Sequence, residues 1–274
     1  MALILALRVV LLLPLISGYN YCNNRSHVCN VGKKKHFMCQ LEQELRPYDN
    51  KSKLHAVFPD TPKLRVKTLG ILNNFRNTFA GGDLITKENK SFPSAKRMRR
   101  IIWDKELAYM ARNHAATVSF KHTECRSTLR FPVVGEFLAL LPPAKKKRNV
   151  MDLLTKSFES MLEEYKDVKD PEGLLQCYDS ERDSNVGHFT LIANDRVSRV
   201  GCGIAASSNC HLDNKVGYCH FLTCHFDYSN LEGSYVYKAG RPAAGCDDWN
   251  GVGSYKYANL CQNLGVIFPP NQGD

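Results

Sequence analysis

Histidine and cysteine are the residue types of this 274-residue chain that could do chemistry. His188 begins an apolar segment in the run Gly187-His188-Phe189-Thr190, and a neutral imidazole can bind a metal ion or act as a general base. A single histidine at the start of a buried strand is more often a core or edge residue with a structural role. The chain has no His-Glu-x-x-His run, no nucleophile motif and no phosphate-binding loop, so the sequence carries no signature of hydrolysis or nucleotide chemistry.

Eleven cysteines point to disulfide bonds rather than to reactive thiols. Residues 1–18 contain a basic residue, the apolar run Val9–Ile16 and two small residues, which predicts a cleaved signal peptide because the run is too short to span a bilayer. The mature chain would begin near Tyr19 and be secreted into an oxidising extracellular compartment, where cysteines form disulfides. Two sequons, at Asn24 and Asn89, are candidate glycosylation sites.

The chain is basic, with a formal net charge of +10 and a pI of about 9.0. This charge favours polyanionic surfaces such as glycosaminoglycan, acidic lipid or nucleic acid, although many secreted proteins are basic without binding any of them. The densest run of positive charge is Lys145, Lys146, Lys147 and Arg148. We interpret it as a solvated loop, with a polyanion contact and a protease-sensitive site as the alternatives.

Apolar patterning indicates which strands would position these groups. The run Phe189–Ala193 and the alternating segment Tyr218–Phe226 are predicted as strands. The polar stretch Ser207–Lys215 between them is predicted as a hairpin connection.

Apolar residues at three- and four-residue spacing predict three helices. The first covers Lys63–Phe79 and is ended by Gly81-Gly82. The second includes Trp103–Ala111, and the third covers Val150–Val168. Residues 19–53 have little to bury, so this segment needs covalent cross-links to be ordered.

Three short motifs have the order and approximate spacing of the signature motifs of the CAP superfamily, which contains the cysteine-rich secretory, antigen 5 and pathogenesis-related proteins. They are residues 187–190, Val200-Gly201-Cys202-Gly203, and Cys224-His225-Phe226 followed by Asn230 and Gly233. The chain resembles most the arthropod antigen 5 branch, and the resemblance covers nearly all of the mature chain. The sequence departs from the family pattern at Asn73 (usually histidine), Phe137 (usually asparagine), Asn194 (usually tryptophan) and Phe226 (usually tyrosine).

The resemblance implies an α+β fold, a three-layer α/β/α sandwich (CAP fold) with a mostly antiparallel central sheet and disulfide-stapled N- and C-terminal extensions. Helices on both sides would cover both faces of the sheet. We expect a signal peptide at 1–18, a cysteine-bearing extension at 19–62, a CAP domain at 63–234 and a cysteine-bearing tail at 235–274.

The resemblance also implies a central cleft in which two histidines and two glutamates converge, here His122, Glu136, Glu164 and His188. Imidazole and carboxylate groups are ligands that Zn²⁺ and similar divalent ions accept, so metal binding is one interpretation. The second is a hydrogen-bonded structural cluster. The third is catalysis, in which a metal ion would activate water and a glutamate would act as base.

The family pattern also guides the expected disulfides. In antigen 5 proteins, the residue matching Cys125 pairs with the second of two neighbouring N-terminal cysteines, which this chain lacks. Cys39 and Cys125 would each have lost a partner, and we predict that they pair with each other. Cys177 is then the odd cysteine, either a free thiol or an intermolecular link. The other predicted pairs are Cys22 with Cys29, Cys202 with Cys224, Cys210 with Cys219, and Cys246 with Cys261.

Two functions compete on these grounds. The first is a secreted antigen 5-like, venom allergen-related binding protein that acts on an extracellular protein or small-lipid ligand, as a monomer without a nucleic-acid partner. The second is a metal-dependent hydrolase or protease that uses the same cleft. We expect the first, and hence no enzymatic activity, because the chain has no hydrolase motif.

Overall fold

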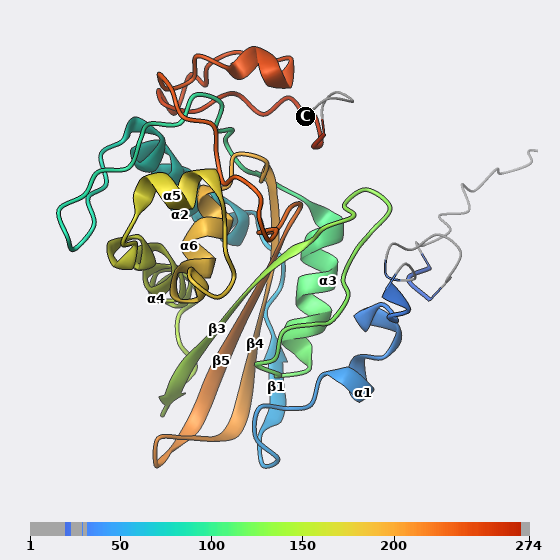
Figure 1. Cartoon of the computed structure of the whole chain (residues 1–274). Coiled ribbons are helices and arrows are strands. Elements are labelled where there is room, and N and C mark those ends of the chain that lie inside the picture. Colours follow the sequence, from blue (N-terminus) through green and yellow to red (C-terminus); the bar gives the residue numbers. More distant parts are fainter. Residues whose placement is uncertain (1–19, 23–28, 30–31, 270–274) are drawn as a thin grey trace, which may run out of the picture.

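The computed structural model describes residues 20–22, 29 and 32–269. The predicted signal peptide and the sequon at Asn24 lie outside the described residues. Asn89 is described and lies exposed in a turn in which its N–H bonds to the Thr86 carbonyl, so its glycosylation stays a prediction. Figure 1 shows a central sheet with helices on both sides.

The sheet contains four antiparallel strands in the order β1, β4, β5, β3, and one short strand, β2, that runs parallel to β4. The predicted, mostly antiparallel sheet is therefore confirmed. β1 lies before the expected domain start at Lys63, yet it is an edge strand of this sheet. The strands are β1 (Lys53–Val57), β2 (Ile102–Trp103), β3 (Gly135–Ala144), β4 (Arg199–Leu212) and β5 (Lys215–Phe226).

Helices cover the two faces of the sheet, which confirms the three-layer α+β fold. On one face, Ala115 at the end of α3 packs with Ala205 and Phe221 of the sheet. On the other face, Leu72 of α2, Phe158 of α4 and Ile192 of α6 belong to the main core with strand residues. The helices are α1 (Leu41–Glu44), α2 (Pro62–Gly81), α3 (Lys105–Ala116), α4 (Val150–Glu163), α5 (Pro171–Gln176) and α6 (Gly187–Ala193).

The ends of the long helices follow from their capping residues. The Thr61 hydroxyl accepts a hydrogen bond from the Leu64 N–H at the start of α2, and Gly82 ends this helix in the left-handed conformation with φ of 84°. Asp104 and Asn149 cap α3 and α4 in the same way as Thr61. Short polar side chains at these positions satisfy N–H groups that have no partner within the helix.

Four predicted elements were wrong, either in type or in extent. Residues Phe189–Ala193 belong to helix α6 and not to a strand; all of them are buried, and a short, fully apolar run fits a buried helix as well as a buried strand. The polar stretch Ser207–Leu212 is not a connection but the end of β4. Trp103 lies in β2, because Asp104 is the N-cap and α3 begins only at Lys105. The predicted third helix ends at Glu163, and a 3₁₀ helix, Glu164–Asp167, continues it.

Two of the five predicted disulfides were wrong. Cys22 pairs with Cys39, and Cys29 pairs with Cys125, with Cα atoms 5.4 and 5.7 Å apart. Our prediction assumed that the two cysteines left without family partners would meet, whereas the extension places Cys29 and not Cys39 beside Cys125. The predicted pairs Cys202–Cys224, Cys210–Cys219 and Cys246–Cys261 are confirmed, and Cys177 is an exposed free cysteine.

The C-terminal tail packs onto the domain around one tryptophan. The Trp249 ring lies against two buried guanidinium groups, with 3.7 Å from its centroid to Arg99 Cζ and 4.8 Å to Arg97 Cζ. Its Nε1 donates to the Arg97 carbonyl, and Arg97 forms a fully buried ion pair with Asp195. The tail is therefore part of the folded body. None of the helices in the described residues is both long and apolar enough to cross a membrane.

Candidate functional site

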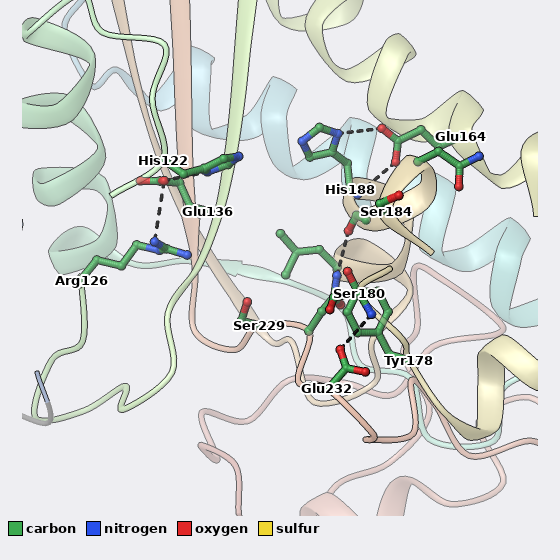
Figure 2. A pocket seen from close by; sticks show the side chains of 14 residues that line it. His122, Arg126, Glu136, Glu164, Tyr178, Ser180, Ser184, His188, Ser229 and Glu232 are labelled. Atoms are coloured by element: carbon green, nitrogen blue, oxygen red, sulfur yellow. Dashed lines mark hydrogen bonds and ion pairs between the residues drawn. The ribbon is translucent and has the colours of Figure 1, made fainter. Parts of the chain in front are cut away.

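All four predicted site residues line one cavity of about 580 Å³. They come from four different elements: His122 from the loop after α3, Glu136 from the start of β3, Glu164 from the start of the 3₁₀ helix that follows α4, and His188 from the first turn of α6. Figure 2 shows that they form two histidine–glutamate pairs on opposite sides of the cavity. The structure thus brings together residues that no local sequence pattern connects.

The first pair is built on a buried carboxylate. Glu136 Oε1 accepts hydrogen bonds from His122 Nδ1 at 2.8 Å and from the Thr123 N–H at 2.9 Å. Its Oε2 accepts from the Thr123 hydroxyl and from His225 Nε2, both at 3.0 Å. Arg126 adds a positive charge 3.7 Å from Oε1. Four donors fix this carboxylate, and through it the His122 ring.

The charge state of Glu136 follows from these contacts. Burial acts to raise its pKa, but the Arg126 charge and the hydrogen bonds from His122 and His225 outweigh burial and hold the pKa well below its ordinary value. Glu136 is therefore an anion near neutral pH. An anionic carboxylate only accepts hydrogen bonds, so His122 carries a proton on Nδ1, and the neutral form of the ring has its lone pair on Nε2.

The second pair joins the end of α4 to the start of α6. Glu164 Oε1 accepts from His188 Nδ1 at 2.6 Å, and Oε2 accepts from the main-chain N–H groups of His188 and Phe189. The ring of Phe137 packs edge-on against the His188 ring, with centroids 5.1 Å apart. Phe137, one of the departures from the family pattern, thus supports the second histidine. Because Nδ1 donates to Glu164, the neutral form of the His188 ring has its lone pair on Nε2.

These two pairs have the donor chemistry of a metal site. Figure 2 shows the rings of His122 and His188 turned toward each other across the cavity, each with its glutamate behind it. A histidine that donates from one ring nitrogen to a carboxylate presents the other nitrogen to a metal ion, and the carboxylate orients it. Both rings are accessible, with 57% and 38% of the side chain exposed for His122 and His188. The two imidazoles fit a divalent metal ion.

The glutamates do not add to the ligand set as the chain is folded here. No group of three or more histidine, cysteine or acidic side chains in the described residues lies close enough together to hold a metal ion. Both carboxylates instead accept hydrogen bonds from the histidines. Solvent would have to supply the other ligands, and the metal assignment stays a prediction.

The residues that support Glu136 were not predicted from the sequence. His225 is fully buried and lies directly opposite Glu136 in the pairing of β3 with β5. It belongs to the third family motif, but its role depends on strand register, which the motif does not show. Arg126 and Tyr178 line the cavity as well, and no sequence pattern pointed to either.

Asn73, at the position of the expected family histidine, has a structural role. It lies buried on α2, where its Nδ2 donates to the Ile101 carbonyl and its Oδ1 accepts the Ile101 N–H. These two bonds attach α2 to the segment before β2. Asn73 does not line the cavity, so its departure from the pattern leaves the histidine–glutamate pairs intact.

The chain is similar to known proteins in both sequence and fold. The model of the cysteine-rich secretory protein family (CAP) matches residues 69–226. Venom allergen-1 of Aedes albopictus is 29% identical over 229 residues, covering 83% of this chain and 82% of that protein. Venom allergen 5 of Dolichovespula arenaria is 30% identical over 207 residues, covering 74% and 93%. The crystal structure of NaASP2 with Zn2+ has a TM-score of 0.58 at 21% identity, covering 74% of this chain and 98% of that one, and shares the fold.

Proposed function

The chain belongs to the CAP family of cysteine-rich secretory proteins, and we propose that it is a secreted, non-enzymatic binding protein whose cavity holds a divalent metal ion between His122 and His188. The venom allergen relatives and five disulfides indicate an extracellular protein. Removal of residues 1–18 as a signal peptide is part of the proposal. The physiological role that we propose for the mature protein is an interaction with an extracellular protein or small lipid.

The observation that carries the metal proposal is the orientation of the two imidazoles. Each Nδ1 donates to a glutamate, which leaves both Nε2 atoms as lone-pair donors facing one cavity. The crystal structure of NaASP2, a protein with the same fold, is one with Zn2+. This supports the use of Zn²⁺ as the metal ion in the binding experiment below. A bound Zn²⁺ would supply a Lewis-acidic, positively charged centre for an anionic group of a ligand.

The metal-dependent hydrolase is the alternative, and the hydrogen bonds argue against it. A general base needs a free lone pair directed at a water molecule. Glu136 already accepts four hydrogen bonds and Glu164 accepts three. Each carboxylate positions a histidine rather than being free to take a proton. Turnover of a peptide and ester panel that is chelator-sensitive and lost in Glu136→Ala would favour the hydrolase instead.

A lipid is the alternative ligand of the same binding protein. An apolar hollow of about 270 Å³ lies between α2 and α4, with Phe75, Leu162 and Tyr165 among its lining residues. An aliphatic chain would bury apolar surface there. Native mass spectrometry tests this role on the protein as it is secreted by cells and again after incubation with fatty acid or sterol. The absence of any lipid adduct in the spectra after incubation would exclude it.

Thermal unfolding tests the metal site. Zn²⁺ at a hundredfold excess over its Kd should stabilise the fold by about 2.7 kcal/mol, which corresponds to a rise in Tm of roughly 5 to 10 °C for a chain of this size. His122→Ala and His188→Ala should each lose most of this rise. The rise should also shrink below about pH 6, because protons compete with metal for imidazole nitrogen.

The matched control is His55→Ala, which removes an exposed histidine of β1 that does not line the cavity. It should retain the full response to Zn²⁺. A His188→Ala protein that is stabilised by Zn²⁺ as strongly as the unchanged chain would show that the metal binds elsewhere.

A further inference from the structure

Three segments far apart in the sequence meet at the end of the sheet opposite the cavity. β3 begins beside the cavity at Gly135, opposite Phe226, and ends at Ala144, opposite Tyr218. At that far end, Lys53 of β1 pairs with Ser208, and Lys215 of β5 pairs with Leu212. The basic run Lys145–Lys147, which directly follows β3, lies at this same end of the sheet. We call the six exposed lysines of these segments the basic end: Lys51, Lys53, Lys145, Lys146, Lys147 and Lys215.

The positive charge of the basic end is not neutralised within the fold. None of the six lysines forms an ion pair within 4 Å in the part of the chain that the structure describes. Two carboxylates lie in the same segments, Asp49 before β1 and Asp213 in the turn before β5, and Asp49 accepts the N–H groups of Lys51 and His211. Lysine charges that face solvent together create a positive potential that attracts polyanions.

The loop with the basic run is held in place at its end. Arg148 donates its main-chain N–H to His220 Nε2 at 3.0 Å, and its guanidinium donates to the Pro142 carbonyl at 3.1 Å. His220 lies on β5 and is fully buried. Residues 145–147 are therefore closed into a short loop beside the sheet, so the three lysines lose less conformational freedom on binding than lysines of a free tail would.

Two helices add positive potential at the same end. α2 begins at Pro62, five residues after β1, and α4 begins at Val150, directly after the basic run. Their N-cap residues, Thr61 and Asn149, line one common hollow of about 240 Å³, together with Lys63. Each helix N-terminus carries a partial positive charge of roughly half a unit, and the shared hollow places the two N-termini next to each other, directly after the basic run in the case of α4.

The shape of the basic end selects among polyanions. The lysines extend from β1 on one edge to the loop after β3 on the other, a width of roughly 14 Å across three strand spacings. Leu54 of β1 lies directly opposite Ser207 of β4, on the face of the sheet that α3 covers. Val216 lies six residues before Leu222 in β5 and therefore on the same face as Leu222, which α4 covers. The two exposed apolar side chains thus point to opposite faces of the sheet. A membrane would need these apolar groups on one surface to anchor there, whereas an extended polyanionic chain needs only a row of cations.

We propose that the basic end binds a sulfated polysaccharide of the glycosaminoglycan class, which lies across the strand ends and contacts lysines from all three segments. Extracellular matrix and cell surfaces present this chemistry to an extracellular, disulfide-bonded protein. Binding there is independent of the histidine–glutamate cavity at the other end of β3.

The test measures binding of the full, disulfide-bonded chain to immobilised heparin by surface plasmon resonance. Lys145→Gln/Lys146→Gln/Lys147→Gln should weaken the affinity about tenfold, because each exposed ion pair contributes modestly. Lys51→Gln/Lys53→Gln/Lys215→Gln should weaken it by a similar factor. Binding should fall steeply with added salt and be lost on desulfated heparin.

The matched control is Lys33→Gln/Lys34→Gln/Lys35→Gln, which removes three exposed lysines of the N-terminal extension and the same net charge. It should keep most of the affinity. An equal loss in this control would show that only net charge matters and would overturn the proposal, as would an unchanged affinity in the variant of Lys51, Lys53 and Lys215. Tighter binding to phosphatidylserine vesicles or to duplex DNA than to heparin would overturn it in favour of those partners.

Discussion

At the residue scale, the cavity depends on a buried histidine that the solvent does not reach. His225 donates from Nε2 to Glu136, and its Nδ1 has no hydrogen-bond partner within the described residues. Burial lowers the pKa of His225 to about 4, although its contacts with Glu136 oppose this shift. A proton on Nδ1 would place an unpaired donor in the core. The fold therefore requires His225 to be neutral.

This requirement predicts a loss of stability in mild acid. Histidine in the unfolded chain binds a proton below about pH 6.5, whereas His225 in the fold stays neutral down to about pH 4. Protons thus favour the unfolded chain between these two pH values. Above about pH 6.5 the histidine is neutral in both states, so His225 adds no pH dependence to the free energy of unfolding there. Between pH 6.5 and pH 4, the titration of His225 alone should lower the free energy of unfolding by about 3 kcal/mol. Urea denaturation at a series of pH values measures this loss.

Replacing the titrating ring should flatten this pH dependence. The amide of His225→Gln can still donate to Glu136 but takes up no proton near neutral pH. The variant should lose clearly less stability between pH 6.5 and 4 than the unchanged chain. His55→Gln, at an exposed position, should leave the slope unchanged; the same flattening in both variants would contradict this role of His225.

The residues of the cavity were predictable only in part. His122, Glu136, Glu164 and His188 were named through the family resemblance, and the structure places all of them in one cavity. His225 was visible in a motif, but its contact with Glu136 exists because β3 and β5 pair in one particular register. Register is set by the packing of the whole sheet, so local patterning could not reveal it.

At the scale of elements, two glycines of β4 bring α3 against the sheet. A Cβ atom at Gly201 would lie 2.0 Å from the Ala108 nitrogen, and one at Gly203 would lie 2.4 Å from Arg112 Cα. Both contacts are with the main chain of α3, which cannot rotate away. The glycines of the second family motif are therefore explained by this close approach of helix and strand.

This packing predicts a clear effect of one methyl group. Gly203→Ala should destabilise the fold by roughly 2 to 3 kcal/mol, because α3 must move away from β4. The corresponding fall in Tm is about 4 to 12 °C, measurable by circular dichroism. The control is Gly70→Ala in α2, where no atom lies within 4 Å of the new Cβ; it should be neutral or stabilising by up to about 1 kcal/mol. Similar Tm values for both variants would rule out this account.

The sequence specified long elements better than short ones. The helix ended by Gly82 was predicted within a few residues, because its apolar stripe, N-cap and left-handed glycine all agree. Phe189–Ala193 was assigned to the wrong element, since five buried apolar residues have no readable period. The order of the three layers, with helices on both faces of the sheet, was predicted from the family resemblance, because the apolar spacing within single segments does not contain it.

At the scale of the whole molecule, one disulfide ties the N-terminal extension to the cavity. Cys29 is bonded to Cys125, 96 residues away, and Cys125 lies three residues after His122. Phe37 adds a main-chain hydrogen bond from its N–H to the Cys125 carbonyl. The extension thereby restrains the loop that presents the first histidine.

Removal of this disulfide should affect both stability and metal binding. Cys29→Ser/Cys125→Ser should lower the free energy of unfolding by roughly 4 to 5 kcal/mol on the chain-entropy estimate for a loop of this length. The Tm rise caused by Zn²⁺ should also shrink, because the His122 loop is less restrained. Cys177→Ser, which removes the exposed free cysteine, should change neither. An unchanged Tm in the double variant would mean that non-covalent contacts alone hold the extension.

The position of the basic run among the disulfides divides the chain into two parts. Cys22–Cys39 and Cys29–Cys125 precede Lys145, and the other three disulfides follow it. Cleavage in this loop would leave two fragments without a covalent link, joined through the hydrogen bonds of β3 with β5 and through the core. His122 and Glu136 would belong to one fragment, and Glu164 and His188 to the other. The cavity is thus a site for fragment complementation: each half brings one oriented imidazole, and neither half alone contains both.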